Sequence, residues 1–230
     1  MSVEIKKLKV TFQEETLLDL SLSIDSALGM VGASGSGKSL TLKALLNLLP
    51  KAMTLTREID APFEFKRGET VAFIPQNPFT ALSPMSKIGA QFHEERRRAA
   101  ELLEVVGLAE WALDRFPSEL SGGQLQRVIA AISLAKEPRL LLLDEPTTAL
   151  DQESKRGILE LFGAIRDRGA DILFVSHDFS AVAAICDNLT VIDRGRIIES
   201  GAREEVLGAP KHDQTKALIA SNFEKREWRV

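Results

Sequence analysis

The fold is decided by the stretch Gly32-Ala33-Ser34-Gly35-Ser36-Gly37-Lys38-Ser39, which follows an apolar run and opens a helical pattern. Its spacing, G-x-x-x-x-G-K-[ST], is typical of a loop that binds nucleotide phosphates. Glycines let the backbone curl so that N–H groups point at a phosphate, and the following helix N-terminus adds partial positive charge. The alternative is an ordinary Gly/Ser turn, but the strand-like run before it and the helix after it favour the phosphate loop (residues 32–39).

Within this loop the side chains predict separate tasks. Lys38 is expected to reach the β- and γ-phosphates of ATP, and Ser39 is expected to ligate Mg²⁺. The predicted ATP-binding residues are Gly32, Ala33, Ser34, Gly35, Ser36, Gly37, Lys38, Ser39 and Leu40.

A second motif follows the apolar run at residues 140–143, where Asp144 and Glu145 stand side by side. A buried strand would deliver both carboxylates to the carboxyl edge of a parallel sheet, where α/β proteins bind ligands. Asp144 is suited to hold Mg²⁺, and Glu145 to orient and deprotonate the attacking water. The alternative is a plain strand end, which the phosphate loop upstream disfavours.

Composition excludes several classes of protein. The chain has 230 residues, 44% of them hydrophobic and 27% charged, which is a globular balance. Its net charge of −4 argues against a nucleic-acid partner, because phosphate backbones usually meet a basic surface. One cysteine, Cys186, excludes an internal disulfide and favours the cytosol. The first residues lack the apolar core of a signal peptide, and no apolar run reaches the ~20 residues that span a bilayer.

Apolar patterns place the elements. Strands are expected at residues 3–12, at 17–24 and in a run ending at Val31, and a helix at 39–49, stopped by Pro50. The continuous apolar runs at 140–143 and 172–176 favour central strands of a parallel sheet, with a crossover helix between them.

The middle of the chain differs from the rest. Residues 85–137 hold two helical patterns, at 88–106 and 124–136, and no convincing strand. We therefore predict a single domain. Its core spans about residues 1–84 and 138–205, a helical lobe about 85–137 is inserted into the core, and a helical tail covers about 206–230.

A third motif is the run Leu120-Ser121-Gly122-Gly123-Gln124. Ser121 and Gln124 form the capping box S-x-x-Q, so a structural helix start is one interpretation. The run also resembles the signature motif of ABC ATPases. The chain is therefore identified as similar to that family, whose fold is α/β, with a parallel-sheet P-loop NTPase core, an N-terminal antiparallel β part and an inserted helical lobe. In the family, the signature residues Ser121, Gly122, Gly123 and Gln124 meet the γ-phosphate held by an opposite subunit.

The resemblance assigns further residues. Gln76 follows the apolar run Val71–Ile74 as the Q-loop glutamine does, near Mg²⁺ and water. Asp151, in Ala149-Leu150-Asp151, resembles the D-loop residue. His177 follows residues 172–176 as the switch histidine does, and contacts the γ-phosphate. The chain has no tyrosine, so Phe12 is the candidate to stack on adenine, although a core phenylalanine is also compatible with that position.

A finer resemblance is to the peptide/nickel branch of ABC importers. It rests on Gln76-Asn77-Pro78-Phe79-Thr80-Ala81-Leu82-Ser83-Pro84 and on Ala209-Pro210-Lys211-His212. The run Gly37-Lys38-Ser39-Leu40-Thr41 resembles the first ATPase subunit of nickel importers. The interval between Gln76 and Ser121 is short for peptide importers, so the lobe looks trimmed.

This resemblance implies a working assembly. Two ATPase subunits, a paralogue or two copies of this chain, would close head-to-tail on ATP and Mg²⁺. Transmembrane permease subunits and, indirectly, an extracytoplasmic substrate-binding protein would complete an importer for nickel or oligopeptides, with this chain on the cytoplasmic face of the membrane. The alternatives are a soluble ABC-type ATPase outside transport and a degenerate regulatory subunit. A soluble ABC-type ATPase would need either coiled-coil heptads or two ATPase domains, and the sequence has neither pattern. The presence of Lys38, Glu145 and His177 argues against a degenerate regulatory subunit.

Overall fold

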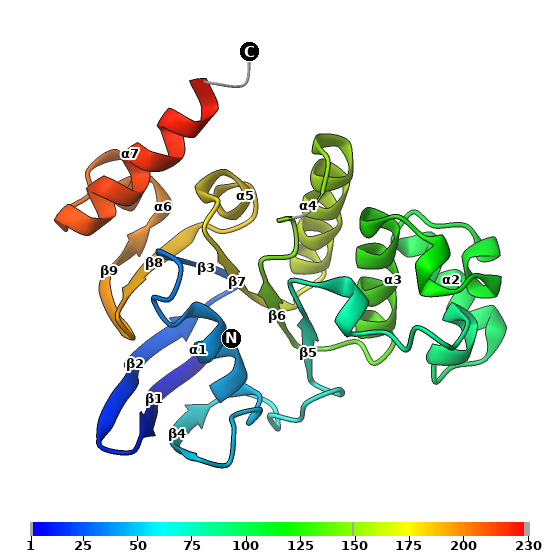
Figure 1. Cartoon of the computed structure of the whole chain (residues 1–230), viewed down its shortest axis with the longest axis horizontal. Helices are drawn as coiled ribbons and strands as arrows, with labels where there is room; N and C mark the ends of the chain where they lie inside the picture. The colour runs from blue at the N-terminus through cyan, green and yellow to red at the C-terminus, as the bar shows by residue number, and fades with distance from the viewer. Residues whose placement is uncertain (1, 149, 228–230) are drawn as a thin grey trace. The chain divides into compact units, whose positions relative to one another are not determined.

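The computed structural model describes residues 2–148 and 150–227, with side-chain surroundings up to residue 222 (Figure 1). Its contacts divide the chain into two compact units, each described by itself. The phosphate-loop unit comprises residues up to Glu64 and from Asp171 onward, and the middle unit comprises Phe65–Ala170. The middle unit extends beyond the predicted lobe on both sides. The division into a core, an inserted lobe and a tail within one domain stays a prediction.

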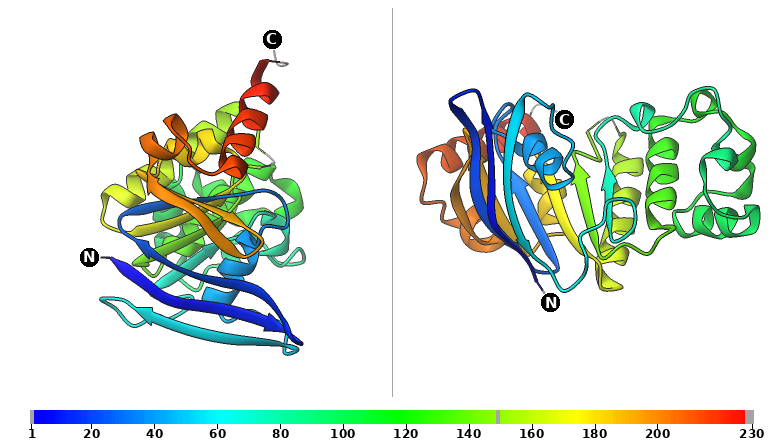
Figure 2. Two further views of the ribbon diagram at one scale, coloured as in Figure 1. Left: turned by 90° about the vertical axis from the view of Figure 1, so that its left-hand side faces the viewer. Right: turned by 90° about the horizontal axis from the view of Figure 1, so that it is seen from below.

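The first sheet of the phosphate-loop unit is antiparallel, as predicted. Its strands lie in the order β2-β1-β4, with β1 at Val3–Phe12, β2 at Glu15–Ile24 and β4 at Met53–Asp60 (Figures 1 and 2). Alternate residues of β2 are buried, because successive side chains of a strand point to opposite faces. β4 was not foreseen, since most of its side chains are exposed and give no apolar pattern.

The second sheet of this unit carries the phosphate loop. Strand β3 (Ala27–Val31), buried throughout, pairs in parallel with β7 (Asp171–Ser176) and with β8 (Asn188–Asp193). This confirms the parallel sheet. β9 (Arg196–Ala202) joins β8 as an antiparallel hairpin, drawn in orange in Figure 2. The hairpin was missed because no residue of β9 is fully buried.

Helices complete the phosphate-loop unit. α1 spans Lys38–Leu45 and ends earlier than the predicted residue 49, because Asn47 adopts a positive φ of 56°. The short α5 (Phe179–Ala183) was not foreseen. α6 (Arg203–Gly208) and α7 (Asp213–Glu227) form the helical tail, and Ala209 and Pro210 separate them as the sequence indicated.

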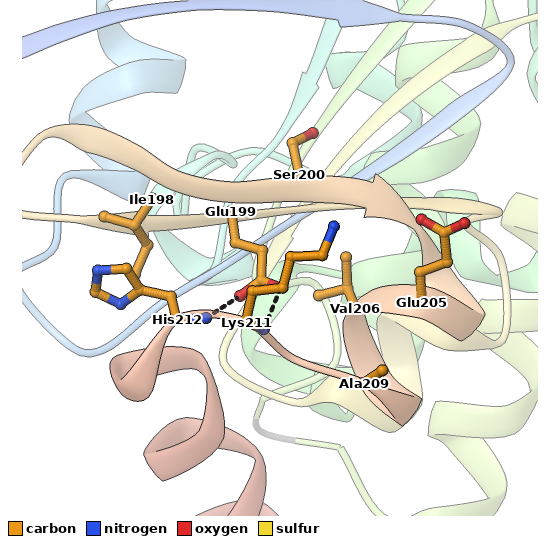
Figure 3. Close-up of a pocket in the computed structure, with 8 residues that line it drawn as sticks. All are labelled: Ile198, Glu199, Ser200, Glu205, Val206, Ala209, Lys211 and His212. Atoms are coloured by element: carbon orange, nitrogen blue, oxygen red, sulfur yellow. Dashed lines mark hydrogen bonds between the residues drawn. The ribbon is translucent and has the colours of Figure 1, made fainter.

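A pocket of about 330 Å³ lies between β9, α6 and the segment that leads into α7 (Figure 3). Glu199 occupies its centre, where its carboxylate accepts hydrogen bonds from the backbone amides of Lys211 (2.8 Å) and His212 (3.1 Å). Partial burial opposes ionisation of Glu199, but its hydrogen bonds outweigh this and lower its pKa. The carboxylate therefore fastens the segment that leads into α7.

The middle unit combines a strand pair with helices. β5 (Val71–Ile74) and β6 (Leu140–Asp144) are parallel, and α4 (Gln152–Asp167) follows β6. Two further helices are α2 (Arg96–Val105) and α3 (Gly122–Leu134). Short 3-10 turns lie at Pro78–Thr80, Ile88–Gln91, Glu110–Asp114 and Pro117–Glu119. No strand occurs among residues 85–137, as predicted.

One helix predicted in the middle unit is wrong. Residues 88–106 do not form a continuous helix, because Phe92 and Glu95 have extended backbones and separate a 3-10 turn from α2. Arg96 then bonds to Glu110 and to both carboxylate oxygens of Asp114. These bonds lower the pKa of Asp114 and hold α2 to the turn at Glu110–Asp114.

Over the described residues, no helix is both long and apolar enough to cross a bilayer.

Candidate functional site

The phosphate loop connects β3 to α1 through two left-handed glycines. Gly35 has a φ of 78°, and Gly37, the N-cap of α1, has a φ of 110°. Residues with a side chain rarely adopt such angles, which explains why the motif requires glycine at position 37 and why glycine suits position 35. Gly37 also has no side chain to accept from the first amides of α1, so these donors point outward from an uncapped helix N-terminus.

Two buried polar groups lie inside the loop. Lys38 is only 6% exposed, and its Nζ donates hydrogen bonds to the carbonyls of Gly32 (2.8 Å) and Ala33 (2.9 Å). The Oγ of Ser36 is buried and makes no hydrogen bond among the described residues. A buried hydroxyl without a partner costs free energy, which a phosphate oxygen would recover by accepting from it. The loop therefore fits a phosphate group.

The turn between β8 and β9 packs against the phosphate loop and is hydrogen-bonded to it. The amide of Gly195 donates to the carbonyl of Ser36 (2.8 Å), and the carbonyl of Gly195 accepts from Asp19 (2.9 Å). A Cβ on Gly32 would lie 2.3 Å from the carbonyl oxygen of Ile192. The loop backbone thus rests directly on this turn, which the sequence did not predict.

His177 leaves the sheet beside the phosphate loop. In the parallel pairing of β3 with β7, Val31 is the partner of Ser176. Since paired residues of neighbouring strands lie side by side, Gly32 and His177 begin adjacent connections at the same sheet edge. His177 is exposed there. The next residue, Asp178, caps α5 by accepting hydrogen bonds from the amides of Ser180 (2.9 Å) and Ala181 (3.3 Å).

The middle unit has an equivalent edge. Ile74 of β5 pairs with Leu143 of β6 in parallel, so the next residues of both strands emerge together. Gln76 follows β5 and is exposed, while Asp144 ends β6 and is 7% exposed. Both carry oxygen donors, which suit Mg²⁺. Among the described residues no group of three or more His, Cys, Asp and Glu side chains could hold a metal ion alone.

Glu145 has an unusual backbone conformation. Its φ is 46°, in the left-handed region that non-glycine residues seldom occupy, and such residues cluster at functional sites. The turn is stabilised by Thr148, whose Oγ1 donates to Glu145 Oε2 (2.8 Å) and whose amide donates to the Glu145 carbonyl (3.2 Å). Thr148 is therefore a positioning residue for the predicted base.

The signature run forms the capping box expected from its sequence. Gln124 Oε1 accepts from the Ser121 amide (2.9 Å), and Ser121 Oγ accepts from the Gln124 amide (3.3 Å). Gly122 and Gly123 are the first two residues of α3, between the two members of the capping box. A helix N-terminus that begins with two glycines lets an anion approach its backbone closely.

Asp151 lies at the start of α4 as its N-cap. Its carboxylate accepts from the amide of Ser154 (2.9 Å) and from its hydroxyl (2.7 Å). These two bonds lower the pKa of Asp151. Ala149, part of the predicted D-loop, lies outside the described residues.

The structure brings together part of the predicted site within each unit. The phosphate loop, Leu40 and His177 share the phosphate-loop unit, and Gln76, Asp144 and Glu145 share one edge of the middle unit. Phe12 ends β1 and is 38% exposed, which leaves its ring accessible. Sequence reasoning missed Thr148 and Ser154. Each follows a predicted site residue by three positions, Thr148 after Glu145 and Ser154 after Asp151, and this spacing was the signal in the sequence that could have identified them.

Comparisons with known proteins agree with this arrangement. The family model described as ABC transporter matches residues 16–148. The oligopeptide transport ATP-binding protein OppD of Bacillus subtilis is 35% identical, over 95% of this chain and 71% of its own length. The glutathione import ATP-binding protein GsiA of Escherichia coli is 33% identical, over 94% of this chain and 41% of its own length. A solved dimeric, post-hydrolysis state of an ATP-binding cassette, bound to ADP and Pi, superposes with a TM-score of 0.71 at 24% identity, over 87% of this chain and 98% of its own.

These residues and matches define a nucleotide-binding domain with a P-loop core. The chain belongs to the ABC transporter family, as an ATP-binding domain with the ABC ATPase fold. The OppD alignment extends over 254 positions, more than the 230 residues of this chain, so that relative has residues without a counterpart here. The trimmed lobe expected from the sequence stays a prediction.

Proposed function

We propose that this chain hydrolyses ATP to drive the uptake of short peptides through a separate membrane permease. The observation that carries the proposal is the register of the two parallel strand pairs. Each pair brings residues that we predict to act on ATP to one sheet edge: Gly32 and His177 in one unit, Asp144 and Gln76 in the other. The oligopeptide relative, which aligns with 95% of the chain, supports peptide as the cargo.

In this proposal, the phosphate loop binds ATP. Lys38 would exchange its two backbone carbonyl partners for β- and γ-phosphate oxygens, and Ser36 would donate its buried hydroxyl. The uncapped N-terminus of α1 would add its amides and its partial positive charge. Phe12, whose ring is accessible, would stack on the adenine.

In this proposal, Asp144, Glu145 and their neighbours carry out hydrolysis. Ser39, Gln76 and Asp144 would hold Mg²⁺, which neutralises the charge that develops on the phosphates. Glu145 would take the proton of the attacking water, in the orientation that Thr148 fixes. His177 would donate a hydrogen bond to the γ-phosphate and stabilise its charge.

The signature run has no role on the nucleotide of its own chain in this proposal. Ser121, Gly122, Gly123 and Gln124 would meet the γ-phosphate held by a second ATPase subunit, at the N-terminus of α3. The solved cassette with a TM-score of 0.71 is itself dimeric. Two chains, identical or paralogous, would close head-to-tail on two ATP molecules and separate after hydrolysis, and the permease would follow this cycle. A substrate-binding protein would deliver the cargo.

The permease places this chain at the cytoplasmic face of the membrane in our proposal. Nickel, predicted from the resemblance to the first subunit of nickel importers, stays the alternative cargo. The soluble-ATPase alternative is less well supported, since between the phosphate loop and the signature the longest helix among the described residues is α2, with 10 residues. A coiled-coil arm requires far longer helices.

The test replaces Glu145 by Gln in the source cell and measures the uptake of labelled short peptides and of labelled nickel. Loss of peptide uptake with nickel uptake intact is the expected result. The matched control is Glu160→Gln, because Glu160 lies on the surface of α4 with 73% of its side chain exposed. Loss of nickel uptake alone would contradict the peptide assignment, and unchanged uptake of both would contradict the importer function.

A further inference from the structure

Ser154 links the signature run, which the proposed function assigns to the contact with the second ATPase subunit, to Asp151, the predicted D-loop residue. It lies in the first turn of α4, three residues after the N-cap Asp151. Its amide and its hydroxyl occupy both carboxylate oxygens of Asp151, at 2.9 and 2.7 Å. Ser154 therefore contributes to the orientation of the Asp151 side chain through both of its carboxylate oxygens.

The same side chain also lies against the signature run. A Cβ on Gly123 would be 2.7 Å from Ser154 Oγ and 3.0 Å from Ser154 Cβ. A Cβ on Gly122 would meet no atom within 4 Å. The second glycine of the signature is thus packed on Ser154, while the first glycine faces open space.

A second contact lies further along the same two helices. A Cβ on Gly157 of α4 would be 2.2 Å from Nη2 of Arg127 on α3. Nη1 of Arg127 donates a hydrogen bond to the carbonyl of Val106, at the end of α2 (2.6 Å). The first contact pairs Gly123 of α3 with Ser154 of α4, and the second pairs Arg127 with Gly157. The residue numbers thus increase along both helices from the first contact to the second. The two helices therefore run side by side with their N-termini at the same end, as the green ribbons of α3 and α4 in Figure 1 show.

We propose that Ser154 is a positioning residue that joins the signature turn (Ser121–Gln124) and the N-cap Asp151 into one rigid element. The inference rests on the proposed function. Subunit closure would then present both groups in a fixed mutual orientation, because neither helix start can shift without disturbing Ser154. Arg127 maintains the parallel alignment of α3 and α4 behind this contact.

The first experiment measures steady-state ATP hydrolysis by the purified chain, with its partner subunit where the pair is required. Ser154→Ala removes the hydroxyl that contacts both Asp151 and Gly123. We expect kcat to fall roughly fivefold or more, with KM for ATP and the melting temperature close to those of the parent. The matched control Arg156→Ala, on the same helix with 75% of its side chain exposed, should retain the parental kcat.

A double-mutant cycle tests the contact itself. Gly123→Ala places a methyl group against Ser154, so its kcat should fall, and the loss in Gly123→Ala combined with Ser154→Gly should be smaller than the sum of the two single losses, because the obstructing atoms are absent. A parental kcat in Ser154→Ala, or losses in the cycle that simply add, would overturn the positioning role. Absence of ATP hydrolysis by the parent would instead contradict the proposed function, so the two failures are distinguishable.

Discussion

Gly195→Ala is expected to destabilise the phosphate-loop unit and to abolish tight ATP binding. Gly195 has a φ of 74°, and a Cβ there would lie 2.1 Å from the carbonyl oxygen of Leu17 and 3.0 Å from Leu18 Cα. Both obstacles are backbone atoms, so no side-chain rotation relieves the overlap. Combined with the strain of a left-handed alanine, the loss of stability should reach about 3 kcal/mol or more.

The same substitution should also displace the phosphate loop. Gly195 bonds to Ser36 and Asp19 through its amide and carbonyl, so a shifted turn would carry the loop backbone with it. Urea unfolding and equilibrium ATP binding measure the two effects. Gly169→Ala is the matched control, since Gly169 has a φ of 96° but a Cβ there would meet no atom within 4 Å. Equal unfolding midpoints for the two variants would contradict the close approach at Gly195.

Glu145→Gln is expected to lower kcat for ATP hydrolysis by about 100-fold or more, because the amide cannot accept the proton of the attacking water. Its carbonyl oxygen can still accept the hydrogen bond from Thr148, so the left-handed turn should persist. ATP affinity should therefore stay within about threefold of the parent. Single-turnover hydrolysis and light scattering in the presence of ATP measure the chemical step and the closed dimer.

The expected outcome is an accumulation of dimers that hold unhydrolysed ATP. Glu160→Gln provides the control for removal of one exposed carboxylate from the same unit. Turnover within a few-fold of the parent would contradict the assignment of Glu145 as the base, whatever the state of the dimer.

Short-range patterns were sufficient for the site motifs. The phosphate loop, the Asp144-Glu145 pair and the Ser121 capping box each occupy consecutive residues whose chemistry and backbone needs are visible in the sequence. The structure confirms the capping box and places the loop between β3 and α1. The parallel strands β6 and β7 were predictable as well, because each contains a continuous, buried apolar run.

Features that depend on distant residues were not predictable. The hairpin of β8 and β9 supports the loop through Ile192 and Gly195, but β9 is only partly buried and has no clear apolar alternation. Ser154 has the pattern of an ordinary first-turn serine until Gly123, far along the chain, is placed against it. The break before α2 was missed because its helical period continues across residues whose backbone is extended.

The central claim is tested most directly by equilibrium binding of Mg²⁺ and ATP to the purified chain and to Lys38→Ala, followed by calorimetry. Lys51→Ala is the matched control, because Lys51 is an exposed lysine in the same unit. The account predicts that the parent and Lys51→Ala bind ATP equally, while Lys38→Ala binds at least about tenfold more weakly through loss of a charge-assisted contact. Equal affinity of Lys38→Ala and the parent, or no binding by the parent, would contradict it.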